Sequence, residues 1–276
     1  MPELKFQPCN ERHSIEDFFL LIRFARQLSE TTFANLVTQA RSRAKRIGLP
    51  GEKQQQGMHF ALDQFSGVST QSHPLFGINF LRFDASGTIE EALILERNSI
   101  GYRTNKYERW EQIVNRLEDL ILPLAEVFIS EIPLINSAQI QYIDRFLAID
   151  QAAVDWSSLF CSGTRWVASG MIDTKTAWHS HCGRFEASLA SQASRRLINV
   201  NVDVGEPMPR IGLPPTNSLS VLTLCADHFL KPDVKLESFA SEMRNHFDAL
   251  HERSKEILSE VLHEDYLNRI GMKTGG

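Results

Sequence analysis

Two histidines and a cysteine lie within four positions of the sequence, at His179, His181 and Cys182. Imidazole nitrogen and thiolate sulfur are groups that hold zinc in proteins, so this stretch raises the question of a metal site. In an extended strand His179 and His181 share one face and Cys182 points to the other, so the three cannot hold one ion without a bulge. A third ligand such as His228 would lack the second paired element of a zinc module. We therefore expect no metal or other cofactor, and His179, His181 and His228 stay weak metal candidates.

The common catalytic signatures are absent from the sequence as recognisable strings. It contains no G-x-S-x-G, no H-E-x-x-H, no phosphate-binding G-x-x-x-x-G-K and no G-x-G-x-x-G. Asp203 with Asp233 and Lys235 could form a nuclease-like metal set, but Pro232 and the loop context argue against it. We lean toward a protein that is not an enzyme. A metal-dependent hydrolase around His179, His181 and Asp203 is the third alternative.

A nucleic-acid interface is the second alternative. The stretch 76–83 partly fits the octapeptide of RNA-recognition modules, with matches that include Phe80 and Phe83. Apolar sheet residues packed under helices explain the same pattern, and we favour that explanation. A basic helix end adds phosphate-binding potential, although the helix dipole also favours cations there. Its residues are Arg41, Arg43, Lys45 and Arg46.

The first half of the chain reads as strand, helix, two strands, helix and strand. A strand is expected over 16–26, a helix from Ser29 to Gly48, and a hairpin from 75–84 and 89–98. A second helix follows a capping box of Asn105 and Glu108 and is kinked or ended by Pro123, and 138–147 alternates as a strand. This order is typical of a ferredoxin-like split βαβ unit, which we assign to residues 1–150. The segment 48–72 remains unassigned.

The second half, residues 151–276, reads as a second antiparallel sheet followed by a long helix. Strands are expected over 176–187, 195–205 and 218–229, with a proline-rich loop over 205–216. A final amphipathic helix runs from Phe239 to Leu262. The fold class is therefore α+β with two sheet-and-helix halves.

Composition indicates a globular chain of the cytoplasm. It has 276 residues, 42% hydrophobic residues and a net charge of -5. Its four cysteines have no paired spacing, and the first residues lack the basic and apolar regions of a signal peptide. No apolar run approaches the ~20 residues that cross a bilayer, so we expect no membrane association. Several large aromatic residues are candidates for a partner surface, namely Tyr102, Tyr107, Trp156, Trp166 and Trp178.

Two segments resemble a sporadically distributed family of uncharacterised bacterial proteins of about this length. They are "YRTNKYERWEQIVNRLEDLILPLAEVF" with the following "QIQYIDRF", and the closing "FDALHERSKEILSEVLHEDYLNRIG". The shared features are Tyr107 and Trp110 at a helix start, the strand 141–145, and Leu250 with His251 in a late helix. The chain departs at Gln141 and Asp144, where the family tends to have arginine and asparagine.

The resemblance implies a genomic context and no catalytic residue. Such proteins look like cargo of mobile or defence islands, which implies a regulatory or interaction component of a bacterial antiviral defence or toxin-antitoxin-like system. We therefore expect a protein partner encoded nearby, with a homo-oligomer or a nucleic acid as further partners.

Overall fold

The computed structural model describes residues 4–10, 12–56, 61–63, 67–69, 75–132, 134–150, 154–174, 176–188, 194–210, 213–229 and 235–272. A ten-stranded antiparallel sheet has the order β10-β11-β12-β9-β2-β8-β7-β6-β3, with β1 paired to β9. Its strands are β1 (Phe6–Pro8), β2 (Ile15–Phe24), β3 (Gly51–Gln56), β6 (Leu75–Phe83), β7 (Ile89–Glu96), β8 (Ser99–Thr104), β9 (Ile135–Ala148), β10 (Trp178–Ala187), β11 (Ser194–Arg210) and β12 (Leu213–Phe229). Strands β4 (Ala61–Asp63) and β5 (Gly67–Ser69) pair as a separate two-stranded sheet.

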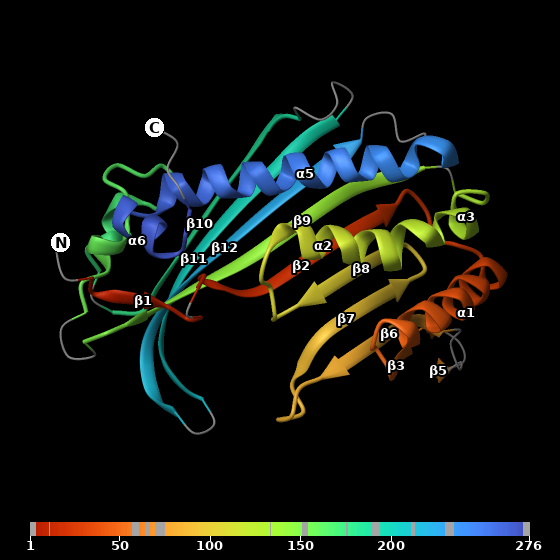
Figure 1. Ribbon diagram of the computed structural model, residues 1–276, viewed down its shortest axis with the longest axis horizontal. Helices are drawn as coiled ribbons and strands as arrows, with labels where there is room; N and C mark the ends of the chain where they lie inside the picture. Colours follow the sequence, from red (N-terminus) through yellow and green to blue (C-terminus); the bar gives the residue numbers. More distant parts are fainter. Residues whose placement is uncertain are drawn as a thin grey trace.

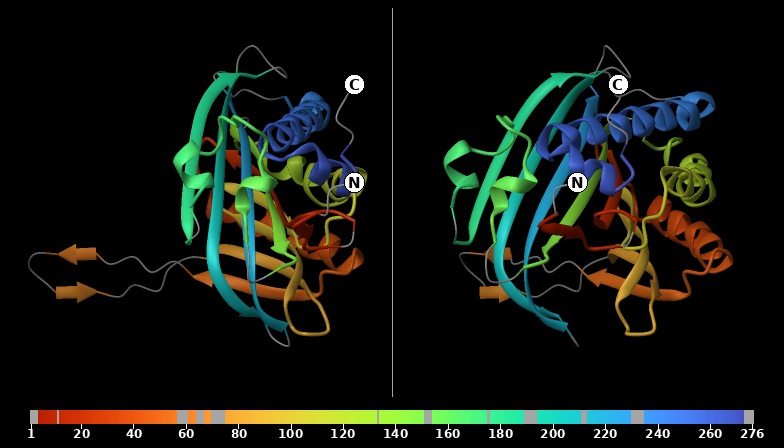
Figure 2. Two further views of the ribbon diagram at one scale, coloured as in Figure 1. Left: turned by 90° about the vertical axis from the view of Figure 1, so that its left-hand side faces the viewer. Right: turned by 60° about the vertical axis from the view of Figure 1, so that its left-hand side comes forward.

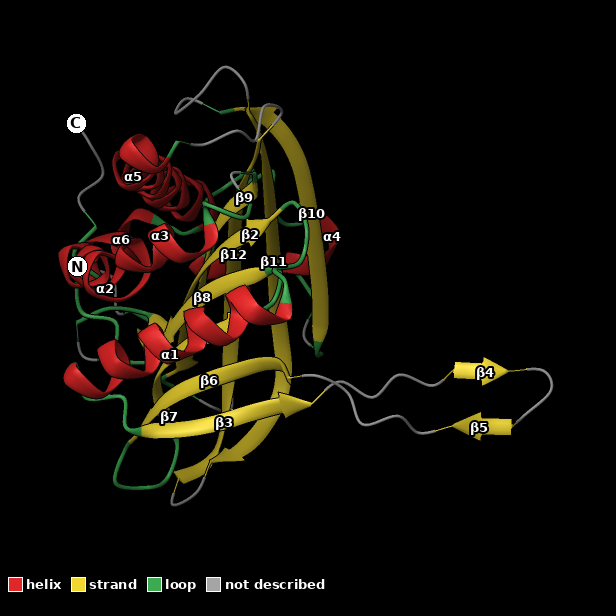
Figure 3. Ribbon diagram, turned by 90° about the vertical axis from the view of Figure 1, so that its right-hand side faces the viewer, coloured by secondary structure: helices red, strands yellow, loops and turns green. Residues whose placement is uncertain are grey.

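Helices cover one face of the large sheet, and the short α4 lies beside β10 (Figure 3). The helical segments are α1 (Glu30–Arg46), α2 (Trp110–Arg116), η1 (Leu117–Ile121), η2 (Leu122–Leu124), α3 (Ala125–Phe128), η3 (Trp156–Leu159), α4 (Ser169–Ile172), α5 (Leu236–Val261) and α6 (Glu264–Arg269). Across the described ranges, none of these helices is both long and apolar enough to cross a membrane.

The first strand and helix form where the sequence predicts them. Ser29 caps α1, since its hydroxyl oxygen accepts from the Thr32 amide at 3.2 Å. Gly48 follows the helix with a φ of 87°, which a residue without Cβ adopts at little cost. The predicted apolar stripe of the helix is buried at Phe33, Leu36, Val37, Ala40 and Ala44.

The second helix differs from the prediction at its start and agrees at its kink. It begins at Trp110 without a side-chain cap, so the capping box from Asn105 is wrong. The Asn105 amide donates instead to the Ile89 carbonyl at 3.1 Å, which ties this residue to β7. The regular helix gives way to a π turn (η1) and a 3-10 turn (η2) around Pro123. Proline has no N–H to continue the α-helical ladder, so a break here is expected.

The predicted ferredoxin-like unit is not clearly formed by the first half. The predicted order appears as β2, α1, β6, β7, α2 and β9. Strands β3 and β8 were not predicted, and β8 lies between β2 and β7, pairing antiparallel with both. A ferredoxin-like sheet has four strands and no such insertion. The structure therefore shows a mixed α+β fold with a larger antiparallel sheet.

The strands of the second half continue the same sheet, so the prediction of a second sheet is wrong. Strand β12 pairs with β9 from Ser218 to His228. The proline-rich stretch is not simply a loop, because β11 runs to Arg210 and β12 starts at Leu213 with register shifts between them. Prolines are tolerated at such irregular ladder positions, where no amide donor is needed. The division into two domains near residue 150 stays a prediction.

Helix α5 forms where the sequence predicts the final amphipathic helix, and it packs on the large sheet. It runs across β9 and β12 (Figure 1), and the sheet curves around it (Figure 2). Its buried face includes Phe239, Met243, Phe247, Leu250, Ile257, Leu258 and Val261. This packing also places the polar residues of α5 above the centre of β9.

Candidate functional site

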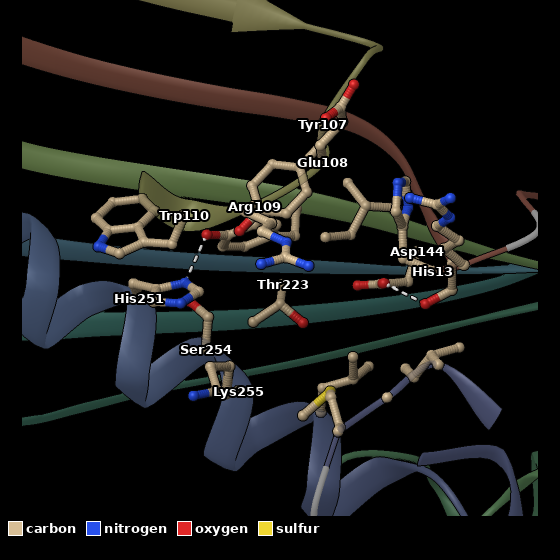
Figure 4. Close-up of a pocket in the computed structure, with 18 of the residues that line it drawn as sticks. His13, Tyr107, Glu108, Arg109, Trp110, Asp144, Thr223, His251, Ser254 and Lys255 are labelled. Carbon is tan, nitrogen blue, oxygen red and sulfur yellow. Dashed lines mark hydrogen bonds between the residues drawn. The ribbon is translucent and has the colours of Figure 1, made fainter. Parts of the chain in front are cut away.

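A cavity of about 610 Å³ lies between the helical face of the sheet, the start of α2 and the middle of α5 (Figure 4). We call it the central cavity. Its walls come from the segments 12–15 and 107–111, from β9, β12 and α5, and from 270–272. Its size is within the range of ligand-binding pockets.

The floor of the central cavity consists of polar residues of two paired strands. Tyr142 and Asp144 are two residues apart on β9 and share one face, and Thr223 of β12 lies directly opposite Tyr142. Asp144 is 2% exposed and Thr223 is 1% exposed. The Thr223 hydroxyl oxygen has no hydrogen-bond partner within the part of the chain that the structure describes. Buried polar groups are nearly always paired, so this atom marks a position for a further group.

Asp144 has one hydrogen-bond donor beside it. The Ser14 hydroxyl donates to Asp144 Oδ1 at 2.6 Å. Ser14 reaches this point because its own carbonyl accepts from the Arg145 amide at 2.7 Å, just before the irregular start of β2. Burial raises the pKa of Asp144 to about 6, against a smaller lowering by the Ser14 hydrogen bond.

A histidine of α5 closes one wall. His251 Nδ1 lies 2.8 Å from the Tyr142 hydroxyl, and the imidazole stacks on Trp110 with ring centres 4.4 Å apart. The Trp110 indole N–H donates to Asp248 Oδ1 at 2.7 Å, so the start of α2 is fixed against α5. Burial lowers the pKa of His251 to about 4, and the side chain is neutral at pH 7.

The opposite wall is aromatic. The Tyr107 ring meets the Tyr142 ring edge-on with centres 5.7 Å apart, and His13 meets Tyr107 edge-on at 6.0 Å. Burial raises the pKa of both phenols and lowers the pKa of His13. The interior therefore holds neutral rings around one carboxyl group.

Charged side chains surround the mouth. Arg12 and Arg109 are exposed, and neither forms an ion pair with another described residue. In Figure 4 the Arg109 guanidinium projects over the cavity. Lys255 pairs with Glu252 at 3.0 Å, and Glu108 and Glu111 add two exposed carboxylates.

Sequence reasoning named part of this site without predicting a pocket. Tyr107, Trp110, Tyr142, Asp144 and His251 belong to the motifs that carry the family resemblance, and the fold brings them together around the central cavity. Sequence reasoning missed Ser14, Arg109 and Thr223. One signal was present, because Asp144 falls on the apolar face of an alternating strand.

The fold does not bring His179, His181 and His228 together among the described residues. His179 and His181 lie on the exposed face of β10, and Cys182 points to the other face, as the strand geometry predicts. The His179 imidazole contacts Asp203 at 2.5 Å, and His181 contacts Asn201 across the same strand pair. His228 pairs with Arg195 in the β11–β12 register, whereas Asp203, the partner of His179, pairs with Ser220. His228 is therefore eight residues along β12 from the position level with His179. Within the described residues no group of three His, Cys, Asp or Glu side chains could hold an ion.

The nuclease-like set falls partly outside the described residues. Asp203 is engaged with His179, Lys235 precedes α5, and Asp233 lies outside the described residues.

The residues of the nucleic-acid alternative divide between surface and core. Phe80 is buried beneath α1, with the Arg41 guanidinium 6.0 Å from its ring centre, whereas Phe83 is 49% exposed. Arg41 pairs with Glu52 at 2.8 Å. Lys45 and Arg46 are exposed, and Arg43 is half-buried. The octapeptide therefore does not present Phe80 for base stacking.

The predicted aromatic partner surface is wrong. All five rings are buried, because they fill the core under the helices or pack against the connection 154–174. They are Tyr102, Tyr107, Trp156, Trp166 and Trp178.

Comparison with known proteins adds no assignment: no protein-family model and no curated protein matches the chain.

Proposed function

We propose that this chain is a non-enzymatic binding protein of the cytoplasm that holds a small polar molecule in the central cavity. The observation that supports this most is the floor of the cavity, where the Thr223 hydroxyl lacks a described partner and Asp144 has only one. A packed core would satisfy or replace such groups, whereas a binding site uses them to orient a ligand.

The His251–Tyr142 pair fits fixed hydrogen bonding better than general acid–base catalysis. A catalytic acid or base works best with a pKa near the operating pH. The pKa of His251 is about 4 and that of the hydrogen-bonded Tyr142 is raised well above 10, so this pair exchanges protons poorly at pH 7. The pair is suited to fixed hydrogen bonding.

The sequence resemblance supplies the wider role. We infer that the chain belongs to the sporadically distributed bacterial family and regulates a protein partner encoded nearby, in a defence or toxin-antitoxin-like system. We further propose that residues 1–150 are a split βαβ unit to which β3 and β8 were added. A ligand between α5, α2 and the sheet would contact elements from both halves, which supports a regulatory use.

Thermal unfolding in the presence of amines, carboxylates, phosphates, amino acids, nucleosides and sugars tests the binding function. A ligand at 100 times its dissociation constant stabilises the folded state by about 2.7 kcal/mol, which corresponds to a rise in Tm of about 5 °C or more. We expect at least one class to raise the Tm of the wild type and not of Thr223→Phe, whose ring fills the cavity. Asp119→Asn, on the exposed surface of η1, is the control and should respond as the wild type does. No rise with any class, or equal rises in both proteins, would contradict the proposal.

RNA or DNA binding is the second candidate, favoured by the exposed Phe83 ring and by the exposed Lys45 and Arg46. Phosphate contacts weaken steeply with salt. Retention of a single-stranded oligonucleotide at 50 mM salt and its loss at 500 mM would support this candidate, provided that Lys45→Glu with Arg46→Glu abolishes it.

A further inference from the structure

Asp144 is a buried carboxyl group without a cationic partner. On the same face of β9 its neighbours are Tyr142 and Phe146, both buried. Its hydrogen-bond donor is the Ser14 hydroxyl, and it forms no ion pair with any residue that the structure describes. An isolated buried carboxylate is costly, so such groups are normally paired.

The chain contains an internal comparison in Asp227, which is also fully buried. Arg196 donates to Asp227 Oδ1 at 2.8 Å and to Oδ2 at 3.0 Å, Ser188 donates at 2.9 Å, and His246 lies at 2.8 Å. Where a buried aspartate has a structural role in this sheet, it therefore receives a cation and several hydrogen bonds. No described residue supplies a cation to Asp144.

The surroundings of Asp144 suit a cationic group. Tyr107 and Tyr142 provide aromatic rings, whose faces attract cations. Thr223 provides an unpaired oxygen that can accept from an ammonium group. His13 and His251 add no positive charge, because burial lowers the pKa of each.

The mouth of the cavity carries charges of both signs, because the exposed carboxylates of Glu108 and Glu111 lie there together with Arg12 and Arg109. The Arg109 guanidinium projects over the cavity (Figure 4), the exposed Arg12 also lines it, and neither arginine forms an ion pair with a described residue. An arginine fork is well suited to a carboxylate or a phosphate. A ligand that extends from the floor to the mouth would thus have the Asp144 carboxylate at its inner end and the two arginines at its outer end.

We propose that the central cavity binds a small zwitterion whose protonated amine pairs with Asp144 and whose carboxylate or phosphate lies at Arg12 and Arg109. This inference rests on the proposed binding function and names its ligand class. Asp144 supplies the negative half of an ion pair, and the protonated amine of the ligand supplies the positive half.

A matched set of probes tests the inference. The probes are 4-aminobutanoate, 2-aminoethyl phosphate, butylammonium, butanoate and 1-butanol, each titrated against the full chain by calorimetry at pH 7.5 and by Tm. We expect the two zwitterions to bind most tightly, butylammonium more weakly, and butanoate and 1-butanol not at all. The stronger of the two zwitterions identifies the anionic group as carboxylate or phosphate.

Substitutions locate the binding. Asp144→Asn should weaken both zwitterions about tenfold or more, since it removes a charge-assisted hydrogen bond. Asp119→Asn removes one charge from the exposed surface of η1 and should leave the affinities unchanged. Arg109→Gln should weaken the zwitterions and spare butylammonium.

The outcomes separate the inference from the function on which it rests. The inference about the ligand class would be wrong if butanoate or 1-butanol bound more tightly than the amines, or if Asp144→Asn left the affinity for amines unchanged. The proposal of a binding cavity would still stand. If no compound bound in this titration or in the wider thermal series, the zwitterion inference and the proposed binding function would both be wrong.

Discussion

Asp144 makes stability depend on pH, because its carboxyl group is buried. The carboxyl group has a pKa of about 6 in the folded chain and 3.8 when exposed. The folded state therefore binds the proton more tightly than the unfolded state between these values. The stability that this proton provides is complete below pH 3.8 and lost as the pH rises through about 6.

From this we predict that Asp144→Asn stabilises the free protein by about 1–3 kcal/mol at pH 8. Asparagine retains an oxygen that accepts from Ser14 and carries no charge to bury. Urea unfolding at pH 8 measures the effect, with Asp119→Asn as the control for net charge. A loss of stability in Asp144→Asn would mean that the carboxylate has a cationic partner in solution.

His251 should have the opposite dependence on pH. Its pKa is 6.5 when exposed and about 4 in the folded chain, because burial disfavours the imidazolium. The stability from this residue is complete above pH 6.5 and is lost as the pH falls toward about 4. The Asp144 and His251 effects then oppose each other over nearly the same range.

We predict that removal of either group exposes the effect of the other. Between pH 6.5 and 4, Asp144→Asn should lose more stability on acidification than the wild type, and His251→Gln should lose less. Each difference should be on the order of 2–3 kcal/mol across the range. Unfolding at half-unit pH steps measures the slopes, and parallel curves for all three proteins would be incompatible with these pKa values.

At the scale of elements, the sequence predicts those with a strong period and misses those whose position depends on pairing. Ile140, Tyr142 and Phe146 alternate clearly along β9, and the stripe of α5 is equally regular. Strand β8 is only Ser99–Thr104 and directly follows β7, and it falls between the predicted hairpin, which ends at residue 98, and the predicted helix start at Asn105. The capping box predicted at Asn105 is wrong because the side-chain amide of Asn105 donates to the Ile89 carbonyl of β7. A local signal cannot tell which of two partners a side chain will have.

The cluster around Asp227 joins β11, β12 and α5. Arg196 and Asp227 are both buried, and His246 of α5 lies 2.8 Å from the same carboxylate. Burial raises the pKa of Asp227, but the hydrogen bonds of His246 and Arg196 and the charge of Arg196 outweigh it, so the pKa is lowered. The pKa of this carboxylate is lowered, in contrast to that of Asp144, which burial raises.

The same substitution should therefore have opposite effects at the two aspartates. We predict that Asp227→Asn destabilises the chain by about 3–5 kcal/mol, since it leaves the Arg196 charge buried and unpaired. The double variant Arg196→Met with Asp227→Asn should recover part of the loss. Urea midpoints at pH 7 measure these changes. An unchanged midpoint in Asp227→Asn would show that water reaches Arg196.

At the scale of the whole molecule, the central cavity depends on contacts that no segment of the sequence contains. Ser14 and Asp144 are separated by 130 positions, and Tyr142 and His251 by 109. Their proximity follows from the β2-β9-β12 register and from the path of α5 across it. The alternation of β9 predicts which residues share a face, but the residues that face them come from register, which hydrophobic pattern alone does not determine.

The continuous sheet leads to a prediction about unfolding. Residues of β9 pair on one side with β2 and on the other with β12, so loss of either half would expose a long unpaired strand edge and the buried face of α5. We therefore expect one cooperative transition, in which far-ultraviolet circular dichroism and tryptophan fluorescence give the same urea midpoint. Phe80→Leu under α1 and Asp227→Asn under α5 should both move that single midpoint, although they lie on opposite sides of β9 in the sheet order. Two midpoints, each moved by only one of the substitutions, would instead indicate two domains that divide near residue 150.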